Sequence, residues 1–140
     1  KDLFQTSVED LQIAHYKVGG HFSCHPDATK EGPRMTTMIV FLNSPKKGGE
    51  LVFPGADQAD FDEISREEAF RANCSNWGGC LRMGGVVVKP AKGDAVFWYN
   101  MRTDLLKRPG PYPREDLVIP TAVHCGADVS AGEKYIATVW

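Results

Sequence analysis

Apolar and polar residues alternate with a period of two along most of the chain, and this pattern predicts β-strands. The strand-like runs are rich in Val, Ile, Thr, Phe, Tyr and Trp, and turn signals such as Gly19-Gly20 and Lys92-Gly93-Asp94 separate them. We expect eight strands, at residues 11–16, 21–25, 35–42, 49–53, 85–89, 94–99, 121–125 and 133–140. Eight short strands in one small domain indicate an all-β core with minor helix, closed as a sandwich, and a jelly roll is favoured over another Greek key.

Two long segments interrupt the alternation. Residues 55–80 are polar and acidic, and one exposed helix could form over 62–72. Residues 101–120 contain four prolines, which exclude a regular central strand. Because a long loop in a compact domain often acts as a lid or binding element, we expect both segments to cover the mouth of a binding site. The alternative is a plain surface insertion.

The length and composition fit a single catalytic or binding domain. The 140 residues and 15.4 kDa suit one hydrophobic core spanning residues 1–140. A net charge of −2 and a pI near 6.1 argue against a nucleic-acid surface. No stretch approaches 18 consecutive apolar residues, which a membrane span requires. The chain opens without a signal-peptide pattern, so we expect a fragment of a longer protein whose membrane contacts would lie in other segments.

The motif His25-Pro26-Asp27 is the first candidate for metal chemistry. Residues i and i+2 of a strand project from the same face, so one imidazole and one carboxylate can converge on an ion. The third ligand should be a distant histidine, and of His15, His21 and His124 only the last lies far along the chain. Two histidines and one carboxylate form the facial triad of non-haem Fe(II) oxygenases, which leaves three coordination positions open. Taken alone, a His-x-Asp motif is more often structural.

Lys134 strengthens the metal hypothesis. It follows His124 by ten residues, at the start of the final predicted strand, so a hairpin can return the chain beside the metal. A cation inside a β-sandwich needs an anionic partner, because burying it alone costs several kcal/mol. A dicarboxylate cosubstrate could supply that anion. The alternative is a lysine at a strand end whose ammonium reaches water.

Four motifs in a fixed order resemble the core of the prolyl 4-hydroxylases. They are Leu11-Gln-Ile-Ala-His-Tyr16 with His25-Pro26-Asp27; Arg34 with Phe41-Leu42-Asn43 and Gly48-Gly49-Glu50-Leu51-Val52-Phe53-Pro54; Val88-Lys89-Pro90 with Gly93-Asp94 and Phe97-Trp98-Tyr99-Asn100; and His124 with Gly132-Glu133-Lys134, Thr138 and Trp140. The resemblance covers the chain apart from 1–10, 55–80 and 101–120. It is closest to the collagen, plant and transmembrane types of the family.

This resemblance implies a double-stranded β-helix, the jelly roll of eight strands, with two long insertions. It implies that Fe(II) is held by His25, Asp27 and His124. It also implies that 2-oxoglutarate chelates the iron and that Lys134 pairs with its 5-carboxylate. Tyr16 matches a tyrosine near the cosubstrate in the family. Thr138 shares a strand face with Lys134, and its hydroxyl could contact the cosubstrate too.

The implied reaction is hydroxylation of peptidyl proline to 4-hydroxyproline, with O2 consumed and succinate and CO2 released. Ascorbate is the expected reductant. Aromatic surface suits a polyproline II ligand, and we assign substrate binding to Trp98, Tyr99, Trp140 and Arg34, with ordinary core packing as the alternative for the first two. Two other functions stay open: the same chemistry on a lysyl residue or free amino acid, and a non-catalytic jelly-roll binding module.

The positions of two cysteines suggest a link between the ligand strands. Cys24 immediately precedes His25, and Cys125 immediately follows His124. Paired residues on antiparallel neighbours have a constant index sum, so if the two histidines face each other, the two cysteines do as well, on the opposite face from the metal. Their Cβ atoms would then be close enough for a disulfide. A reduced, buried pair is the alternative.

Cys74 and Cys80 could form a second disulfide in the polar segment. Four cysteines are too few for a disulfide-rich scaffold, and none of the spacings is typical of zinc. Two disulfides would suit an oxidising compartment. We therefore expect the endoplasmic reticulum or secretory lumen, with the cytoplasm as the alternative.

Overall fold

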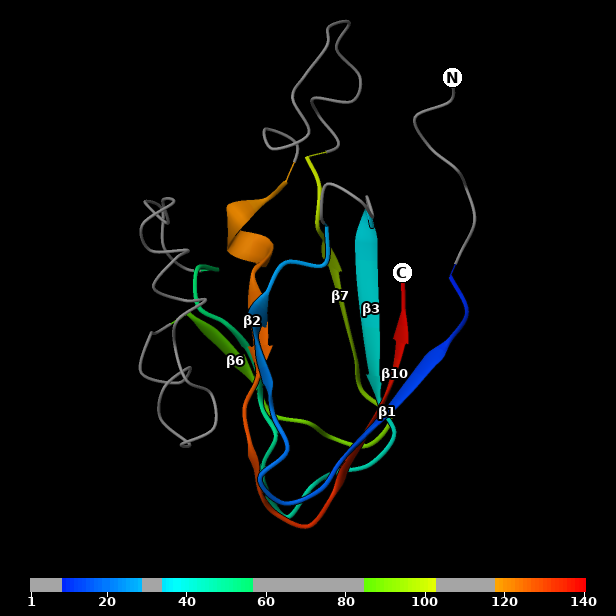
Figure 1. Cartoon of the computed structure of the whole chain (residues 1–140), viewed down its shortest axis with the longest axis vertical. Helices are drawn as coiled ribbons and strands as arrows, with labels where there is room; N and C mark the ends of the chain where they lie inside the picture. The colour runs from blue at the N-terminus through cyan, green and yellow to red at the C-terminus, as the bar shows by residue number, and fades with distance from the viewer. Residues whose placement is uncertain (1–8, 29–33, 57–84, 103–117) are drawn as a thin grey trace, which may run out of the picture.

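Two four-stranded antiparallel sheets face each other in the computed structural model, which describes residues 9–28, 34–56, 85–102 and 118–140 (Figure 1). The first sheet has the order β1 (Gln12–Tyr16), β10 (Lys134–Val139), β3 (Thr36–Phe41), β7 (Ala95–Tyr99). The second has the order β2 (Phe22–His25), β8 (His124–Gly126), β5 (Leu51–Phe53), β6 (Val86–Val88). This arrangement confirms the predicted jelly-roll sandwich.

The strand count differs from the eight that the periodicity predicts. A third, two-stranded sheet pairs β4 (Lys47–Gly48) with β9 (Val129–Ala131), so the described residues contain ten strands. Strand β4 is too short to display a period, and Gly48 has a φ of 80° with no room for a Cβ against the Asp128 carbonyl. The predicted strand 121–125 begins with a 3-10 turn, η2 (Pro120–Ala122), and only its last two residues belong to β8.

The hydrophobic core lies between the two sheets. Ile39, Phe41 and Ile136 of the first sheet pack against Leu51 and Phe53 of the second. In the first sheet, alternation along each strand directs every second side chain to the outer face, away from the core. Large apolar side chains are exposed there, at Ile13, Met38, Phe97 and Tyr99. The core therefore fills the space that the two inner faces share, as the period of two requires.

Strand β10 is the last of the chain and lies between β1 and β3. Its register places Lys134 opposite Tyr16 and Thr138 opposite Gln12, all facing the second sheet. No helix among the described residues is long and apolar enough to span a bilayer. The expected helix at 62–72, and most of both insertions, lie outside the described residues.

Candidate metal centre and cosubstrate pocket

The three predicted metal ligands meet at the junction of two neighbouring strands. His25 ends β2 and His124 begins β8, and the ladder pairs these two residues directly. Asp27 lies two residues beyond the end of β2 and is 6% exposed. The His25 Nε2 atom lies 3.6 Å from Asp27 Oδ1, and the His124 Nε2 atom lies 3.7 Å from Asp27 Oδ2. One ligand atom from each residue falls within 4.8 Å of the others, which is the spacing of a metal site.

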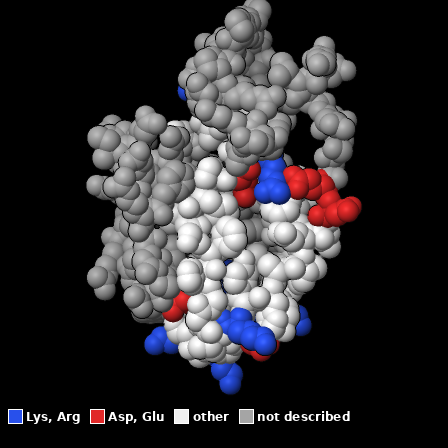
Figure 2. Space-filling view, viewed as in Figure 1, with Lys and Arg blue, Asp and Glu red and all other residues white. Residues whose placement is uncertain are grey.

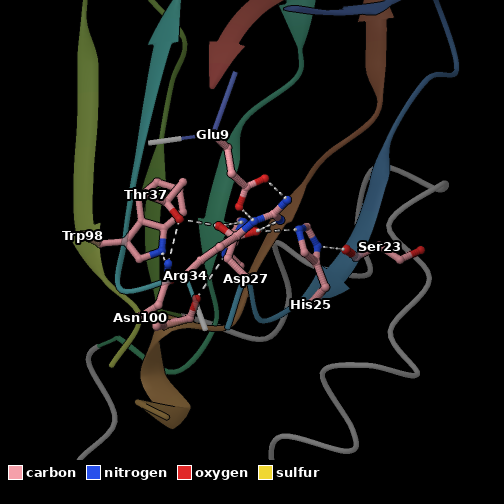
Figure 3. Close-up of polar contacts among 10 residues, drawn as sticks. Glu9, Ser23, His25, Asp27, Arg34, Thr37, Trp98 and Asn100 are labelled. Carbon is pink, nitrogen blue, oxygen red and sulfur yellow. Dashed lines mark hydrogen bonds and ion pairs between the residues drawn. The ribbon is translucent and has the colours of Figure 1, made fainter. Parts of the chain in front are cut away.

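The second ring nitrogen of each histidine is held by the backbone. His25 Nδ1 lies 2.7 Å from the Ser23 carbonyl (Figure 3), and His124 Nδ1 lies 3.1 Å from the Ala122 carbonyl. A carbonyl only accepts, so each Nδ1 donates and each Nε2 keeps its lone pair. Both lone pairs are therefore available to a cation beside Asp27, an arrangement that recurs at metal-binding histidines.

Burial and neighbouring charges place these groups in the ionisation states that bind metal. Burial by itself raises the pKa of Asp27, but His25, His124 and the Thr37 hydroxyl outweigh it and lower the pKa to about 2. Burial lowers the pKa of His124 to about 4. At neutral pH the carboxylate is ionised and the His124 imidazole is neutral. The donor set of two imidazoles and one carboxylate fits Fe(II).

The same pocket contains the predicted cosubstrate residues. Lys134, Tyr16 and Thr138 line it together with the three candidate ligands. Lys134 is 4% exposed, and among the described residues no carboxylate lies within ion-pair distance of its ammonium. Burial lowers the pKa of Lys134 to about 8, an effect that Glu50 partly offsets. A buried ammonium in these surroundings is suited to bind an anion.

The Lys134 ammonium lies beside strand β8, close to the candidate ligand His124. A Cβ built on Gly126 would lie 4.0 Å from the Lys134 ammonium nitrogen. Gly126 follows His124 by two residues on the same face of β8, a separation of about 7 Å along a strand. The buried ammonium and the candidate metal ligands therefore line one pocket from neighbouring positions along β8.

Arg34 and Trp140 adjoin the metal ligands. The guanidinium of Arg34 stacks on the Trp140 ring at 3.6 Å and donates two hydrogen bonds to Glu9, of 2.7 and 2.9 Å (Figure 3). Its Nη1 atom lies 4.0 Å from Asp27 Oδ1. Trp140 also lines the pocket. The structure thus brings two predicted substrate residues together, along with Glu9, which was not predicted from the sequence.

Trp98 and Tyr99 point to opposite sides of the first sheet. Trp98 packs edge-on against His124, with ring centroids 4.7 Å apart, and also contacts Phe53. Tyr99 is 54% exposed on the outer face beside Phe97. Neither residue lines the pocket of the candidate metal ligands, and both border an apolar groove between the edge strands β6 and β7. Alternation along β7 explains why adjacent aromatics separate in this way.

A comparison with known protein families shows to which family this chain belongs. The model of the 2OG-Fe(II) oxygenase superfamily matches residues 11–140. The chain belongs to this superfamily. Among curated relatives of this oxygenase chain, probable prolyl 4-hydroxylase 4 of Arabidopsis thaliana is 32% identical over 94% of the chain and 41% of its own length. The human transmembrane prolyl 4-hydroxylase is 31% identical over 94% of the chain and 29% of its own length.

A solved structure shows the same fold as this oxygenase chain. The viral collagen prolyl hydroxylase of Paramecium Bursaria Chlorella virus-1, solved as a 2OG complex, superposes with a TM-score of 0.61 at 25% identity. The match covers 96% of this chain and 57% of the viral one. The chain therefore spans less than two thirds of the relatives and the solved structure that it matches.

Three hydrogen bonds in this oxygenase connect the candidate ligand Asp27 to strand β7. Thr37 Oγ1 donates to Asp27 Oδ2 at 2.6 Å, Asn100 Nδ2 donates to Thr37 Oγ1 at 2.7 Å, and Trp98 Nε1 donates to Asn100 Oδ1 at 2.7 Å (Figure 3). Thr37 and Asn100 are each 1% exposed. Neither was predicted as a site residue, although a threonine in step with Ile39 on the inward face of β3 is a signal that could have found the first.

Charged side chains are unevenly distributed on the face shown in Figure 2. They gather at two places, toward opposite ends of the described surface, and uncharged surface lies between them. One of the described ion pairs joins Arg34 to Glu9.

Proposed function

We propose that this domain hydroxylates peptidyl proline at C4, using Fe(II), 2-oxoglutarate and O2 and releasing succinate and CO2. The observation that carries the proposal is the single pocket that contains His25, Asp27, His124 and Lys134. The relatives that share this fold are prolyl hydroxylases, which supports proline as the substrate. We also propose that residues 1–140 contribute the catalytic domain of the protein.

His25, Asp27 and His124 would hold the iron. When bound, it supplies the redox chemistry that couples decarboxylation of 2-oxoglutarate to transfer of one oxygen atom to a C–H bond. The protein presents the donor atoms of Asp27 and His124 in their deprotonated forms, because both residues have lowered pKa values. The surrounding side chains also limit the access of water, since Asp27 and His124 are both buried.

Lys134 would bind the 5-carboxylate of 2-oxoglutarate. Its ammonium is desolvated, so pairing with a carboxylate recovers the free energy that burial costs. Tyr16 lies opposite Lys134 on the ladder, with its ring 5.5 Å from the ammonium, and Thr138 lines the same pocket. Their hydroxyls would donate further hydrogen bonds to the carboxylate.

Arg34 and Trp140 would bind the peptide. The Arg34 Nε and Nη2 atoms are engaged by Glu9, and Nη1 is directed toward Asp27 without a hydrogen bond among the described residues. The Trp140 indole N–H is buried and has no partner among them. Both donors could bind the backbone carbonyls of a polyproline II segment, which has no internal hydrogen bonds. Trp98 would act through its ring contact with His124.

The compartment and the reductant are proposed on two separate grounds. A disulfide joins Cys24 to Cys125, and disulfides persist in oxidising compartments. This supports the endoplasmic reticulum or secretory lumen. Ascorbate is proposed as the reductant from the resemblance to the prolyl 4-hydroxylases. Any membrane contact would belong to segments outside this chain.

The proposal is tested by supplying Fe(II), 2-oxoglutarate and ascorbate with a panel of proline-rich peptides, and locating any added oxygen atom by fragment mass spectrometry. We expect the gain on prolyl C4, with one succinate per hydroxylation. Matched lysyl peptides and free amino acids should stay unmodified. Hydroxylation only of those controls would assign the same chemistry to another substrate. Peptide binding without succinate formation would instead indicate a non-catalytic module.

A further inference from the structure

The hydrogen bonds between Trp98 and Asp27 have only one possible direction. An indole N–H is always a donor, so the Asn100 atom that faces Trp98 is its carbonyl oxygen. The amide nitrogen of Asn100 then faces Thr37 and donates to the hydroxyl oxygen. With its acceptor side occupied, Thr37 directs its own proton to Asp27, whose ionised carboxylate only accepts. Trp98 at one end of this series of hydrogen bonds and Asp27 at the other therefore fix the orientation of Asn100 and Thr37 between them.

The backbone holds this network rigidly in place. Thr37 and Trp98 are directly opposed on the β3–β7 ladder. The Asn100 N–H donates to the Met35 carbonyl at 2.8 Å, and the Asn100 carbonyl accepts from Ile119 at 2.9 Å. A buried amide with both backbone and both side-chain groups engaged has little freedom to turn.

We propose that Thr37 is a positioning residue for the metal site. It holds the Asp27 carboxylate through Oδ2, so that Oδ1 remains available as the single ligand atom, and Asn100 and Trp98 keep the hydroxyl aimed at Oδ2. This inference rests on the proposed metal site. A carboxylate that bound through both oxygens would take up one of the three open positions that 2-oxoglutarate and O2 require. The network thus keeps the open coordination positions free, and it also supports metal affinity.

The same network reaches a second ligand. Trp98, which ends the hydrogen-bond chain, also packs edge-on against the His124 ring at 4.7 Å. Strand β7 therefore supports one ligand by hydrogen bonds and another by ring contact, although β7 supplies no ligand itself. Residues that orient metal ligands in this way commonly affect metal affinity or activity by about 10- to 100-fold.

The test is an anaerobic titration of the apoprotein with Fe(II), and separately with Co(II), monitored by calorimetry and by the Co(II) ligand-field spectrum. Thr37→Val removes the hydroxyl and keeps the shape, and we expect the metal Kd to rise about 10- to 100-fold. Thr37→Ser restores the hydroxyl and should recover most of the affinity. Thr36→Val is the matched control, since this neighbour on β3 pairs with Tyr99 and points to the other face.

Asn100→Asp tests the direction of the network with almost no change of shape. The new carboxylate would compete with Asp27 for the Thr37 proton, so metal affinity should fall. The double variant Thr37→Val, Asn100→Asp should lose no more metal affinity than Thr37→Val alone, because both substitutions break the same hydrogen bond between Thr37 and Asp27. A second measurement is the ratio of hydroxylated peptide to succinate, which should fall in Thr37→Val. A change that only loosened the fold would lower the apoprotein Tm without changing this ratio.

The possible outcomes separate this inference from the proposed function. A folded Thr37→Val variant with a metal Kd within about twofold of the wild type would overturn the role of Thr37. If that variant does not fold, an unchanged Kd in Asn100→Asp overturns it equally. A wild-type protein that binds neither metal would refute the metal site itself, and the positioning role with it.

Discussion

Cys24 and Cys125 are joined by a disulfide that links β2 to β8 directly beside the opposed histidines of those strands. Their Cα atoms are 4.2 Å apart, and 101 residues separate them in sequence. The register pairs His25 with His124 and shifts between Phe22 and His25, and the cysteines that flank the two histidines meet across the two strands. Of the two alternatives that the sequence allows, the structure shows the disulfide. The proposed pair of Cys74 and Cys80 lies outside the described residues and stays a prediction.

Removing this disulfide should destabilise the protein strongly. Replacing Cys24 and Cys125 together by Ser releases a loop of 101 residues, and we expect the free energy of unfolding to fall by about 2–5 kcal/mol. Denaturant unfolding of the apoprotein measures this. Wild-type protein held in a strong reductant should behave like the double variant. Recovery of free, alkylated thiols at both positions, in protein prepared from an oxidising compartment, would contradict the disulfide.

His124→Ala should abolish both turnover and stoichiometric metal binding. The reason is that His124 supplies one of the three donor atoms grouped beside Asp27. His15→Ala is the control, because His15 stacks on Tyr135 and pairs with Glu133, away from the pocket. Metal content by elemental analysis and succinate release are the measurements. Full iron content with full activity in His124→Ala would refute the ligand assignment.

Lys134→Ala should raise the KM for 2-oxoglutarate while metal affinity stays nearly unchanged. Loss of one partner from a buried charge pair costs about 2–5 kcal/mol, which is on the order of 30-fold or more. Lys134→Arg should also be impaired, because the lysine stem is closely packed: a Cβ on Gly49 would lie 3.1 Å from its Cδ. Steady-state kinetics with varied cosubstrate check both variants. An unchanged KM in Lys134→Ala would rule out the role.

Cosubstrate binding should weaken above pH 8 because Lys134 has a lowered pKa of about 8, against an ordinary value of 10.5. The ammonium binds the carboxylate, so above pH 8 binding must take up a proton, and affinity should fall about tenfold per pH unit. The stability of the apoprotein changes in the opposite direction and rises between pH 8 and 10.5, where the unfolded chain holds the extra proton. Calorimetry in buffers of different ionisation enthalpy measures the uptake. Lys134→Met should show none.

Arg34→Lys should raise the KM for the peptide and leave the KM for 2-oxoglutarate unchanged. A lysine keeps the charge but loses the planar stack on Trp140 and the two-point contact with Glu9. Peptide-dependent and cosubstrate-dependent kinetics, measured on one preparation, separate the two effects. An equal rise in both constants would place Arg34 in general support of the pocket instead of peptide binding.

The parts of the fold that could be predicted are those that repeat a pattern. The period of two located all eight strands of the two main sheets. His25 and Asp27 do lie together, as predicted, but β2 ends at His25, so the bend after the strand and not the same-face rule brings Asp27 to it. Strand β4 was missed because two residues show no period, and η2 was missed because Pro120 interrupts an apolar run. Expected closure of 55–80 and 101–120 over the pocket stays a prediction, testable by hydrogen exchange with and without peptide.

The site could be predicted where its residues lie close together in the sequence, and it could not be predicted where a contact joins residues that are far apart in the sequence. The spacing of His25 and Asp27 is local, and Lys134 was found by its offset from His124. By contrast, Asn100 acts through Thr37, 63 residues away. Nothing in the sequence around Asn100 identifies that partner, because the contact exists only once β3 and β7 are paired.

The central place of β10 joins the two ends of the described fold in one sheet. The register pairs Gln12 with Thr138, so the first of the described strands receives its partner in the sheet from the last of them. Without β10, β1 would have no neighbour among the described strands and one edge of β3 would be open, and open edges invite pairing with other chains. Lys134 lies on that same strand. The closure of the sheet and the placement of Lys134 therefore depend on one set of contacts between residues far apart in the sequence, which is the kind of contact that forms slowly in folding.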